Sequence, residues 1–310
     1  MVPDVSIVTP SFNQGRFIER TIQAVLSQDT GGRTLEYIVV DGGSRDQTLE
    51  VLRRHTDRVR WISEPDRGQA DAVNKGVRAT SGAIIGWLNS DDVYFPGAVR
   101  AACDFLDAHP AVDVVYGDGL HIDEHDRPLE PYPTEPFRLA RLLETCYLCQ
   151  PAVFFRRRVV ERFGLLDERL HYTLDYEYWL RLARGGAQFA HLPRVLAGSR
   201  LHPDIKTFTG RLQLHAEANT MLRERLGRVP ERWIYNYAHA RLERSPIDAS
   251  QHLRFACGLA IFSLWASLRW NHDLPPSVRQ TVLIWLKDGL KRWSWSVRAS
   301  LRTRLRTRPR

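Results

Sequence analysis

The sequence predicts an α/β protein whose doubly wound, mostly parallel sheet is followed by a C-terminal helical region. In the N-terminal third, short apolar runs alternate with segments whose apolar side chains recur at helical spacing, which is typical of parallel strands joined by crossover helices. Each predicted strand there also ends in polar residues, and strand carboxyl ends face the ligand crevice of such sheets.

The predicted strands are short, apolar and rich in β-branched residues, and the first four are each followed by a helical period. They span residues 5–10, 37–40, 60–63 and 84–94, with later strands at 112–116, 150–155 and around 195–196. The predicted helices span residues 16–28, 47–55, 69–80 and 98–108. The polar residues at 121–126 have a spacing compatible with metal ligands, but the Asp126-Arg127-Pro128 turn favours a hairpin.

Two adjacent carboxylates, Asp91 and Asp92, end the apolar run that begins at Ile84. They repel each other unless a cation or hydrogen-bond donors lie between them. Carboxylate oxygens suit Mg²⁺ or Mn²⁺, and Mg²⁺ is usually shared with substrate phosphates. The segment therefore predicts a metal–diphosphate site, with an Asp-Asp helix N-cap before Pro96 as the alternative.

Polar groups follow four successive strands, at Thr9–Asn13, Asp41, Glu64–Asp66 and Asn89–Asp92. Four such sets at one edge of a sheet are hard to explain as solvated turns. Asp41 is followed by two glycines that let a ligand approach the backbone closely. Its carboxylate can accept hydrogen bonds from a ribose or a base, although a plain Asp-Gly turn is the simpler alternative.

Four motifs stand in a fixed order along the chain. They are Val5-Ser6-Ile7-Val8-Thr9-Pro10-Ser11-Phe12-Asn13, Val40-Asp41-Gly42-Gly43-Ser44-x-Asp46-x-Thr48, Glu64-Pro65-Asp66-x-Gly68-x-x-Asp71-Ala72-x-Asn74-x-Gly76 and Leu88-Asn89-Ser90-Asp91-Asp92. Together they resemble the family 2 glycosyltransferases of the GT-A fold, of the kind that assembles bacterial surface polysaccharide such as O-antigen. The resemblance covers roughly residues 4–205.

The resemblance implies an inverting transfer from a nucleotide-diphosphate sugar, most often a UDP-sugar. Asp41 then contacts the ribose or base, and Asp66 contacts the uracil ring. The donor site is expected to contain Thr9, Pro10, Ser11, Asn13, Asp41, Glu64, Asp66, Asn89 and Ser90.

The resemblance also places the metal. Asp91 falls on the second Asp of the family's Asp-x-Asp motif, whereas Asn89 replaces the first. Asp92 either assists Asp91 or caps the next helix. His202 resembles a late His that such enzymes place near the metal or diphosphate, and the nearby Arg200 suits phosphate oxygens. The expected cofactor is Mn²⁺ or Mg²⁺, held by Asp91, Asp92 and His202.

Asp175 is the expected general base. It matches the Asp of the family's Glu-Asp pair, with Leu174 in the Glu position. A carboxylate within hydrogen-bond reach can take the proton of the acceptor hydroxyl. Glu177 is the second candidate for the base, and Gln150 and Glu177 are expected on the acceptor side. The alternative is that Asp175 only caps the helix that follows.

The C-terminal third predicts a separate region, with a catalytic domain at 1–210 and a helical region at 211–310. Residues 277–310 hold ten basic side chains and one acid, Asp288, although the net charge of the whole chain is only +8. Val282, Leu286, Leu290, Trp293, Val297 and Leu301 form one apolar stripe. Such a helix predicts binding to an anionic membrane surface. The alternative is packing on the catalytic domain, and no stacking platform supports nucleic-acid binding.

These features predict a cytoplasmic protein that is peripheral on the inner face of the plasma membrane, with a saccharide or lipid-linked acceptor. No signal peptide is visible, no apolar run reaches the ~18 residues of a membrane span, and the four cysteines form no disulfide framework. Two alternatives stay open: a catalytically silent sugar-nucleotide-binding or scaffold protein, and a nucleotidyltransferase. A nucleotidyltransferase would need a glycine- and basic-rich triphosphate loop near the first strand, and this sequence does not have one there.

Overall fold

The computed structural model describes residues 3–247 and 250–306, with side chains described up to residue 294. The chain divides into two compact units, Met1–Ile205 and Lys206–Arg310. The boundary expected near residue 210 lies close to this division. Each unit is described by itself below.

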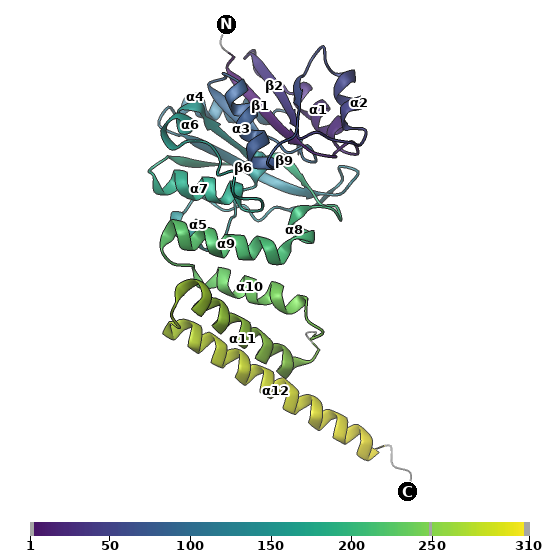
Figure 1. Ribbon diagram of the computed structural model, residues 1–310, viewed down its shortest axis with the longest axis vertical. Helices are drawn as coiled ribbons and strands as arrows, with labels where there is room; N and C mark the ends of the chain where they lie inside the picture. Colours follow the sequence, from purple (N-terminus) through teal and green to yellow (C-terminus); the bar gives the residue numbers. More distant parts are fainter. Residues whose placement is uncertain (1–2, 248–249, 307–310) are drawn as a thin grey trace. The chain divides into compact units, whose positions relative to one another are not determined.

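The first unit is built on a nine-stranded sheet in which four neighbouring strands are parallel (Figure 1). In spatial order these are β3 (Arg60–Ser63), β2 (Leu35–Asp41), β1 (Val5–Ser11) and β4 (Ile84–Trp87). Helices α1 (Ile18–Leu26), α2 (Thr48–Arg54) and α3 (Gln69–Ala79) connect them. The order reverses at β1, so a ligand crevice is expected at the carboxyl ends of β1 and β4. The predicted α/β class and strand–helix rhythm are confirmed.

The other half of the sheet is mixed. It continues from β4 through β8 (Val153–Arg156), β6 (Val114–Ile122), β9 (Phe189–Arg200) and β5 (Val93–Tyr94), and β7 (Pro128–Pro131) pairs with β6. Strand β5 follows β4 closely in sequence yet pairs with β9 at the far end of this order. Because the link Leu88–Asp92 is short, the sheet must curve until the ends of β4 and β9 approach each other.

Three predicted elements differ in detail. The segment 84–94 is two strands, because the polar residues Asn89–Asp92 leave the ladder between them. The strand expected at 150–155 begins only at Val153, after the 3₁₀ turn η1 (Gln150–Ala152), in which Pro151 cannot donate to a ladder. Strand β9 runs well beyond residues 195–196, because it pairs with β6 over most of its length. The hairpin at 121–131 is confirmed.

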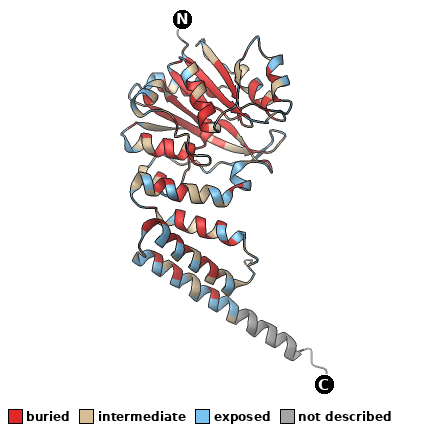
Figure 2. Ribbon diagram, in the orientation of Figure 1, coloured by how far each residue is buried: buried red, intermediate tan, exposed pale blue. Residues whose placement is uncertain are grey.

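Helices cover the sheet, and the strands are the most buried part of the first unit (Figure 2). Every residue of β1 is buried. The remaining helices of this unit are α4 (Ala98–Ala108), α5 (Leu139–Glu144), α6 (Arg157–Phe163) and α7 (Leu174–Arg184).

The second unit is entirely helical over the residues that the structure describes. Its helices are α8 (Lys206–Thr209), α9 (Arg211–Leu226), α10 (Glu231–Glu243), α11 (His252–Asn271) and α12 (Pro276–Arg306). Among the described residues, no helix is both long and apolar enough to cross a membrane.

Candidate active site

The closing of the sheet brings Asp91, after β4, next to His202, after β9. The Oδ2 atom of Asp91 lies 3.2 Å from Nε2 of His202, although the two residues are 111 positions apart in sequence. The imidazole is buried against the ring of Phe17, with the ring centroids 4.8 Å apart. Its Nδ1 atom has no hydrogen-bond partner among the described residues.

This pair fits a metal that is shared with a substrate. Within the described part of the chain, no group of three His, Cys, Asp or Glu side chains is placed to hold a metal ion. A carboxylate oxygen is a ligand for Mn²⁺ or Mg²⁺, a neutral imidazole nitrogen suits Mn²⁺, and Mg²⁺ usually takes its other ligands from water and phosphates. The residues present therefore suit a metal–diphosphate complex better than a cage built by the protein alone.

Asp92 is not the third ligand that the sequence suggested. Its Oδ1 accepts the backbone N–H of Arg200 at 2.9 Å, and its Oδ2 accepts Nδ2 of Asn89 at 3.3 Å. Burial, and then the neighbouring charge of Asp91, raise the pKa of this carboxyl well above its ordinary value. Asp92 therefore holds the loop between β4 and β5 in place.

Arg200 is also engaged inside the protein and does not face a phosphate. Its buried guanidinium donates to the backbone oxygens of Asp91 and Asp123, at 2.6 and 2.8 Å. It also pairs with the carboxylate of Asp126. Its role is to fix the backbone of Asp91 against the β6–β7 hairpin.

Asn89 is the centre of a buried amide network. Its Oδ1 accepts Nε2 of Gln69 at 2.7 Å and Nε1 of Trp87 at 2.9 Å. Its Nδ2 donates to Oε1 of Gln150 at 2.9 Å, besides Asp92. Gln150 in turn donates to the backbone oxygen of Trp87 at 2.7 Å. Gln150 thus supports this loop, and its amide is not free on the acceptor side.

The end of β1 carries the expected nucleoside pocket. Ser11 is buried, and its Oγ has no hydrogen-bond partner among the described residues, so it can bind a ligand. Asn13 has a positive φ of 53° and accepts the N–H of Arg45 at 2.9 Å, which ties this loop to the one after β2. Thr9 instead faces the core, where its hydroxyl lies 3.2 Å from that of Tyr37. Pro10 is buried in β1.

Asp41 organises the neighbouring loop instead of facing a ribose. It is fully buried, and its carboxylate accepts the N–H groups of Gly43 and Ser44 at 3.1 and 2.9 Å. It also accepts the hydroxyls of Ser44 and Ser63. These four donors use both oxygens.

Asp66 is the partly exposed carboxylate beside that loop. A Cβ at Gly42 would lie 2.5 Å from its Oδ2, so glycine at this position leaves room for the Asp66 carboxylate where it lies. Burial raises the pKa of Asp66, while the N–H of Gly68 and the charge of Lys75 act against this. Glu64 is exposed and pairs with Lys75 at 2.8 Å.

Asp175 lies in the first turn of α7 and is partly exposed. Glu177, two residues on, is fully buried and pairs with Arg181 at 3.0 Å. Arg181 also donates to the backbone oxygen of Leu165 at 2.8 Å. Glu177 is therefore a structural ion pair, and the structure does not support it as a base or as an acceptor contact.

Tyr132 follows β7, and its backbone N–H donates to the backbone oxygen of Gly119 at 2.9 Å. Burial raises the pKa of its hydroxyl well above the ordinary value. The sequence did not suggest this residue.

Thr21 was also missed. Its hydroxyl on α1 is directed at the backbone oxygens of Ser90 and Asp92, at 2.9 and 2.8 Å. The signal was a buried hydroxyl on the apolar face that α1 makes with Ile18, Ile22 and Val25. Ser90 itself is buried, and its backbone oxygen takes part in this contact.

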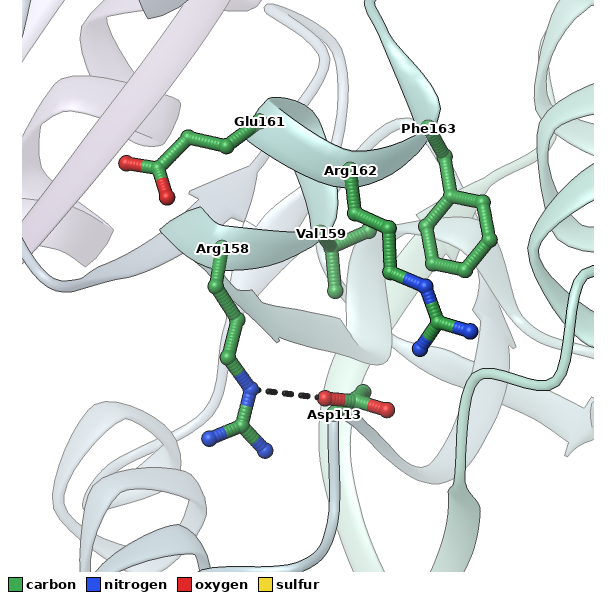
Figure 3. Close-up of a pocket in the computed structure, with 6 residues that line it drawn as sticks. All are labelled: Asp113, Arg158, Val159, Glu161, Arg162 and Phe163. Carbon is green, nitrogen blue, oxygen red and sulfur yellow. Dashed lines mark hydrogen bonds and ion pairs between the residues drawn. The ribbon is translucent and has the colours of Figure 1, made fainter.

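A cavity of about 370 Å³ lies at α6, away from these residues (Figure 3). Its lining is Asp113, Arg158, Val159, Glu161, Arg162 and Phe163. Arg158 is already paired with Asp113 at 2.8 Å. Arg156, the last residue of β8, directly precedes α6 and is the strand partner of Ile84, the first residue of β4. The cavity therefore lies near the amino end of β4, whereas Asn89–Asp92 follow its carboxyl end.

Comparison with known proteins finds similar sequences and similar folds. Residues 6–164, about half of the chain, match the model of glycosyl transferase family 2. An Escherichia coli chondroitin synthase is 30% identical over 204 residues, which cover 65% of this chain and 29% of that protein. An uncharacterized glycosyltransferase of Mycobacterium tuberculosis (strain ATCC 25618 / H37Rv) is 34% identical over 185 residues, 58% of this chain and 69% of its own length.

Solved structures share the fold. Residues 1–349 of Staphylococcus aureus TarS, in complex with UDP-GlcNAc, match 92% of this chain and 89% of that one, with a TM-score of 0.60 and 15% identity. The match covers half of a longer TarS chain. The mannosyltransferase PcManGT of Pyrobaculum calidifontis, in complex with GDP-Man and Mn²⁺, matches 96% of this chain and 84% of that one, with a TM-score of 0.58 and 19% identity. The predicted GT-A fold is confirmed.

Replacing Arg200 by Met should weaken Mn²⁺-dependent nucleotide binding by about 10- to 100-fold, because groups that orient a metal ligand contribute on that order. The matched control is Arg20→Met. Arg20 also pairs with Asp126 but makes no contact with Asp91. Titration calorimetry gives the affinities, and thermal melting shows whether each variant folds. An equal loss of nucleotide affinity in the two variants would contradict a specific role for Arg200.

Proposed function

Because the chain belongs to glycosyl transferase family 2, we propose that it is an inverting, metal-dependent glycosyltransferase. It moves a hexosyl group from a nucleotide-diphosphate sugar, with UDP as the expected nucleotide, to a hydroxyl of a saccharide or lipid-linked saccharide. The single observation that carries this proposal is the contact between Asp91 and His202 at the carboxyl ends of β4 and β9. Two potential metal ligands meet there, at the edge where such sheets bind ligands.

Asp91 and His202 would hold the cation together with the donor diphosphate. A bound divalent cation there stabilises the negative charge that develops on the diphosphate as it leaves. The protein prepares this site with Arg200, Thr21 and Asp92, which fix the backbone around Asp91.

Asp175 is proposed as the general base. The acceptor oxygen attacks the anomeric carbon from the side opposite the diphosphate, the bond from that carbon to the diphosphate oxygen breaks, and Asp175 takes the hydroxyl proton. One displacement of this kind inverts the anomeric configuration. The position of Asp175 supports the role, since it is partly exposed in the first turn of α7, where the helix dipole favours a negative charge.

The nucleoside is proposed to lie between the ends of β1 and β3. Ser11 offers a buried hydroxyl without a partner among the described residues, and Asp66 offers a partly exposed carboxylate that can accept the imide N–H of uracil. Asn13 and Asp41 keep the loops around them in shape. TarS has been solved with UDP-GlcNAc and with UDP, which supports trying uridine nucleotides first.

The acceptor is proposed to be carried on or near a membrane. The basic, apolar C-terminal segment 277–310 supports peripheral association with an anionic surface, which suits assembly of a surface polysaccharide on a lipid carrier.

The donor site is tested by titration calorimetry of the full chain with UDP, with and without Mn²⁺. We expect binding to require Mn²⁺ in the wild type and to be lost in Asp91→Asn, because the amide removes a charged metal ligand. Wild-type binding that ignores Mn²⁺, or an Asp91→Asn variant with unchanged affinity, would refute the metal site. Failure to bind UDP, followed by binding of GDP, would change the nucleotide only.

The base is tested by Asp175→Asn, with Glu177→Gln as the matched carboxylate-to-amide control on the same helix. Asp175→Asn should lower kcat by about 10²–10⁴-fold while leaving UDP affinity and the melting temperature unchanged. Glu177→Gln should lower the free energy of unfolding by up to about 3 kcal/mol, since it leaves the charge of Arg181 poorly paired, but should retain kcat in the folded fraction. A large loss of kcat in Glu177→Gln, with kcat retained in Asp175→Asn, would make Glu177 the base.

The contact of Asp66 with uracil predicts a pH dependence. Burial raises the pKa of Asp66, so the carboxylate protonates at a higher pH than an ordinary Asp and then loses its ability to accept the imide N–H. UDP affinity should therefore fall as the pH is lowered through this raised pKa. The UDP affinity of Asp66→Asn should lack this part of the pH dependence. The ratio of wild-type to variant affinity at each pH separates the titration of Asp66 from that of other groups, including the diphosphate. A ratio that stays constant as the pH is lowered from neutrality to the ordinary titration range of an aspartate would exclude the contact.

A further inference from the structure

The exposed apolar side chains of this protein are concentrated on two helices. Among the described residues, eleven large apolar side chains are exposed, and seven of them lie on α11 and α12. They are Ile261, Trp265, Leu268, Leu283, Ile284, Leu290 and Trp293. Soluble proteins seldom expose such groups together unless the surface binds a partner.

On α11 these residues form a stripe. Ile261, Trp265 and Leu268 follow each other at steps of four and three, which places them on one face of a helix. Other positions of α11 are used for packing: Gly258 lies against Leu242 of α10, and Ala256 lies against Gly289 of α12. Trp265, at the edge of the stripe, stacks on Tyr237 of α10 with the ring centroids 5.9 Å apart. Ile261 and Leu268 are 63% and 50% exposed and are the part of the stripe that is left for a partner.

Helix α12 also has distinct faces. Val278, Val282 and Gly289 are buried. Ser277 and Trp285 face α10, where Ser277 bonds Glu231 and Trp285 lies 5.0 Å from the ring of Tyr235.

Leu283 and Leu290, both exposed, lie about 160–180° around α12 from the side that faces α10. Since α10 packs on both α11 and α12, the side chains turned away from it lie on one common side of the pair. Ile284 is equally exposed, but it lies on the flank of α12 near α10. The apolar face is thus Ile261 and Leu268 of α11 together with Leu283 and Leu290 of α12.

The charged side chains of these two helices are mostly basic. Helix α11 has no acidic residue, and α12 has only Asp288 among its described side chains. The basic side chains are Arg254, Arg269, Arg279, Lys287, Lys291 and Arg292. An apolar face bordered by basic groups and tryptophans matches the interface of a bilayer with anionic headgroups.

We propose that α11 and α12 together form the membrane-docking face, with both helices lying in the plane of an anionic bilayer surface. This rests on the membrane association proposed above and adds its location. Part of the stripe expected on α12 from the sequence is used otherwise, since Val282 is buried. The docking face keeps Leu290 from that stripe, adds Leu283, and gains Ile261 and Leu268 from α11.

The test is flotation of the full chain with vesicles of phosphatidylcholine alone or mixed with phosphatidylglycerol. Point variants are preferable to truncation, because α12 also supplies the buried seam of Val278, Val282 and Gly289. The wild type should float with the anionic vesicles only. Ile261→Gln with Leu268→Gln, and separately Leu283→Gln with Leu290→Gln, should each weaken binding by about tenfold or more, because each removes buried apolar area from the bilayer.

The matched control is Ile284→Gln, since Ile284 is 50% exposed and Leu290 is 52% exposed on the same helix. It should bind vesicles like the wild type. An Ile284→Gln variant as weak as the others would refute the face. Variants that change the sedimentation coefficient but not flotation would assign the face to a second copy of the chain instead.

Binding of UDP with Mn²⁺ is measured on the same samples. Retained UDP binding with lost flotation supports the docking face independently of the donor site. A wild type that floats with anionic vesicles but binds neither UDP nor GDP would refute the donor site and leave the docking face standing.

Discussion

The pairing of β5 with β9 is the constraint on which the site depends. A link of only five residues, Leu88–Asp92, joins β4 in the middle of the sheet to β5 at its far end, so the sheet has to curve back on itself. The curvature carries the end of β9, with Arg200 and His202, to the loop that holds Asp91. Neither the parallel nor the mixed part of the sheet contains the proposed metal site alone. Asp91 and His202 meet because the sheet closes to this shape.

The residues around that loop show how the fold holds a reactive carboxylate in place. Thr21 and Arg200 donate to backbone oxygens on either side of it, and Asp92 accepts from the backbone of Arg200. Each of these groups is buried, so leaving any of them without its partner carries a desolvation cost of about 1–3 kcal/mol. That cost couples the position of Asp91, the proposed metal ligand, to the packing of α1 and β9. If Asp91 has the proposed role, activity and local stability depend on the same hydrogen bonds.

Local pattern was enough to predict the fold but not the direction of every side chain. Buried faces of strands and helices give apolar residues a regular spacing that can be seen in the sequence. The predicted strand ends therefore indicated the correct edge of the sheet for the site. Asp41 was assigned to a ligand because polar residues at a strand end usually face the crevice, Gln150 and Glu177 because of the family resemblance, and Arg200 because it lies near His202. The structure turns each of them inward, to Ser44, Asn89, Arg181 and Asp126 respectively. Glu177 and Arg181 are four residues apart on α7, a spacing that helical periodicity does indicate. The partners of Gln150 and Arg200 are distant in sequence, and that of Asp41 depends on loop shape, so no periodicity indicates them. Thr21 and Tyr132 were missed for the same reason.

The two departures from the family motifs have a physical reason in this fold. Asn89 is surrounded by the acceptors Oδ2 of Asp92 and Oε1 of Gln150, to which its amide donates. A carboxylate at this position could not donate and would add a charge beside the buried Asp92. Leu174 is buried at the start of α7, where an ionised Glu would lose its hydration. Both departures therefore change residues that pack beside the two acids. Asp91 and Asp175 themselves match the family motifs and are partly exposed. The departures are accommodated by neutral packing around the two acids on which the proposed chemistry depends.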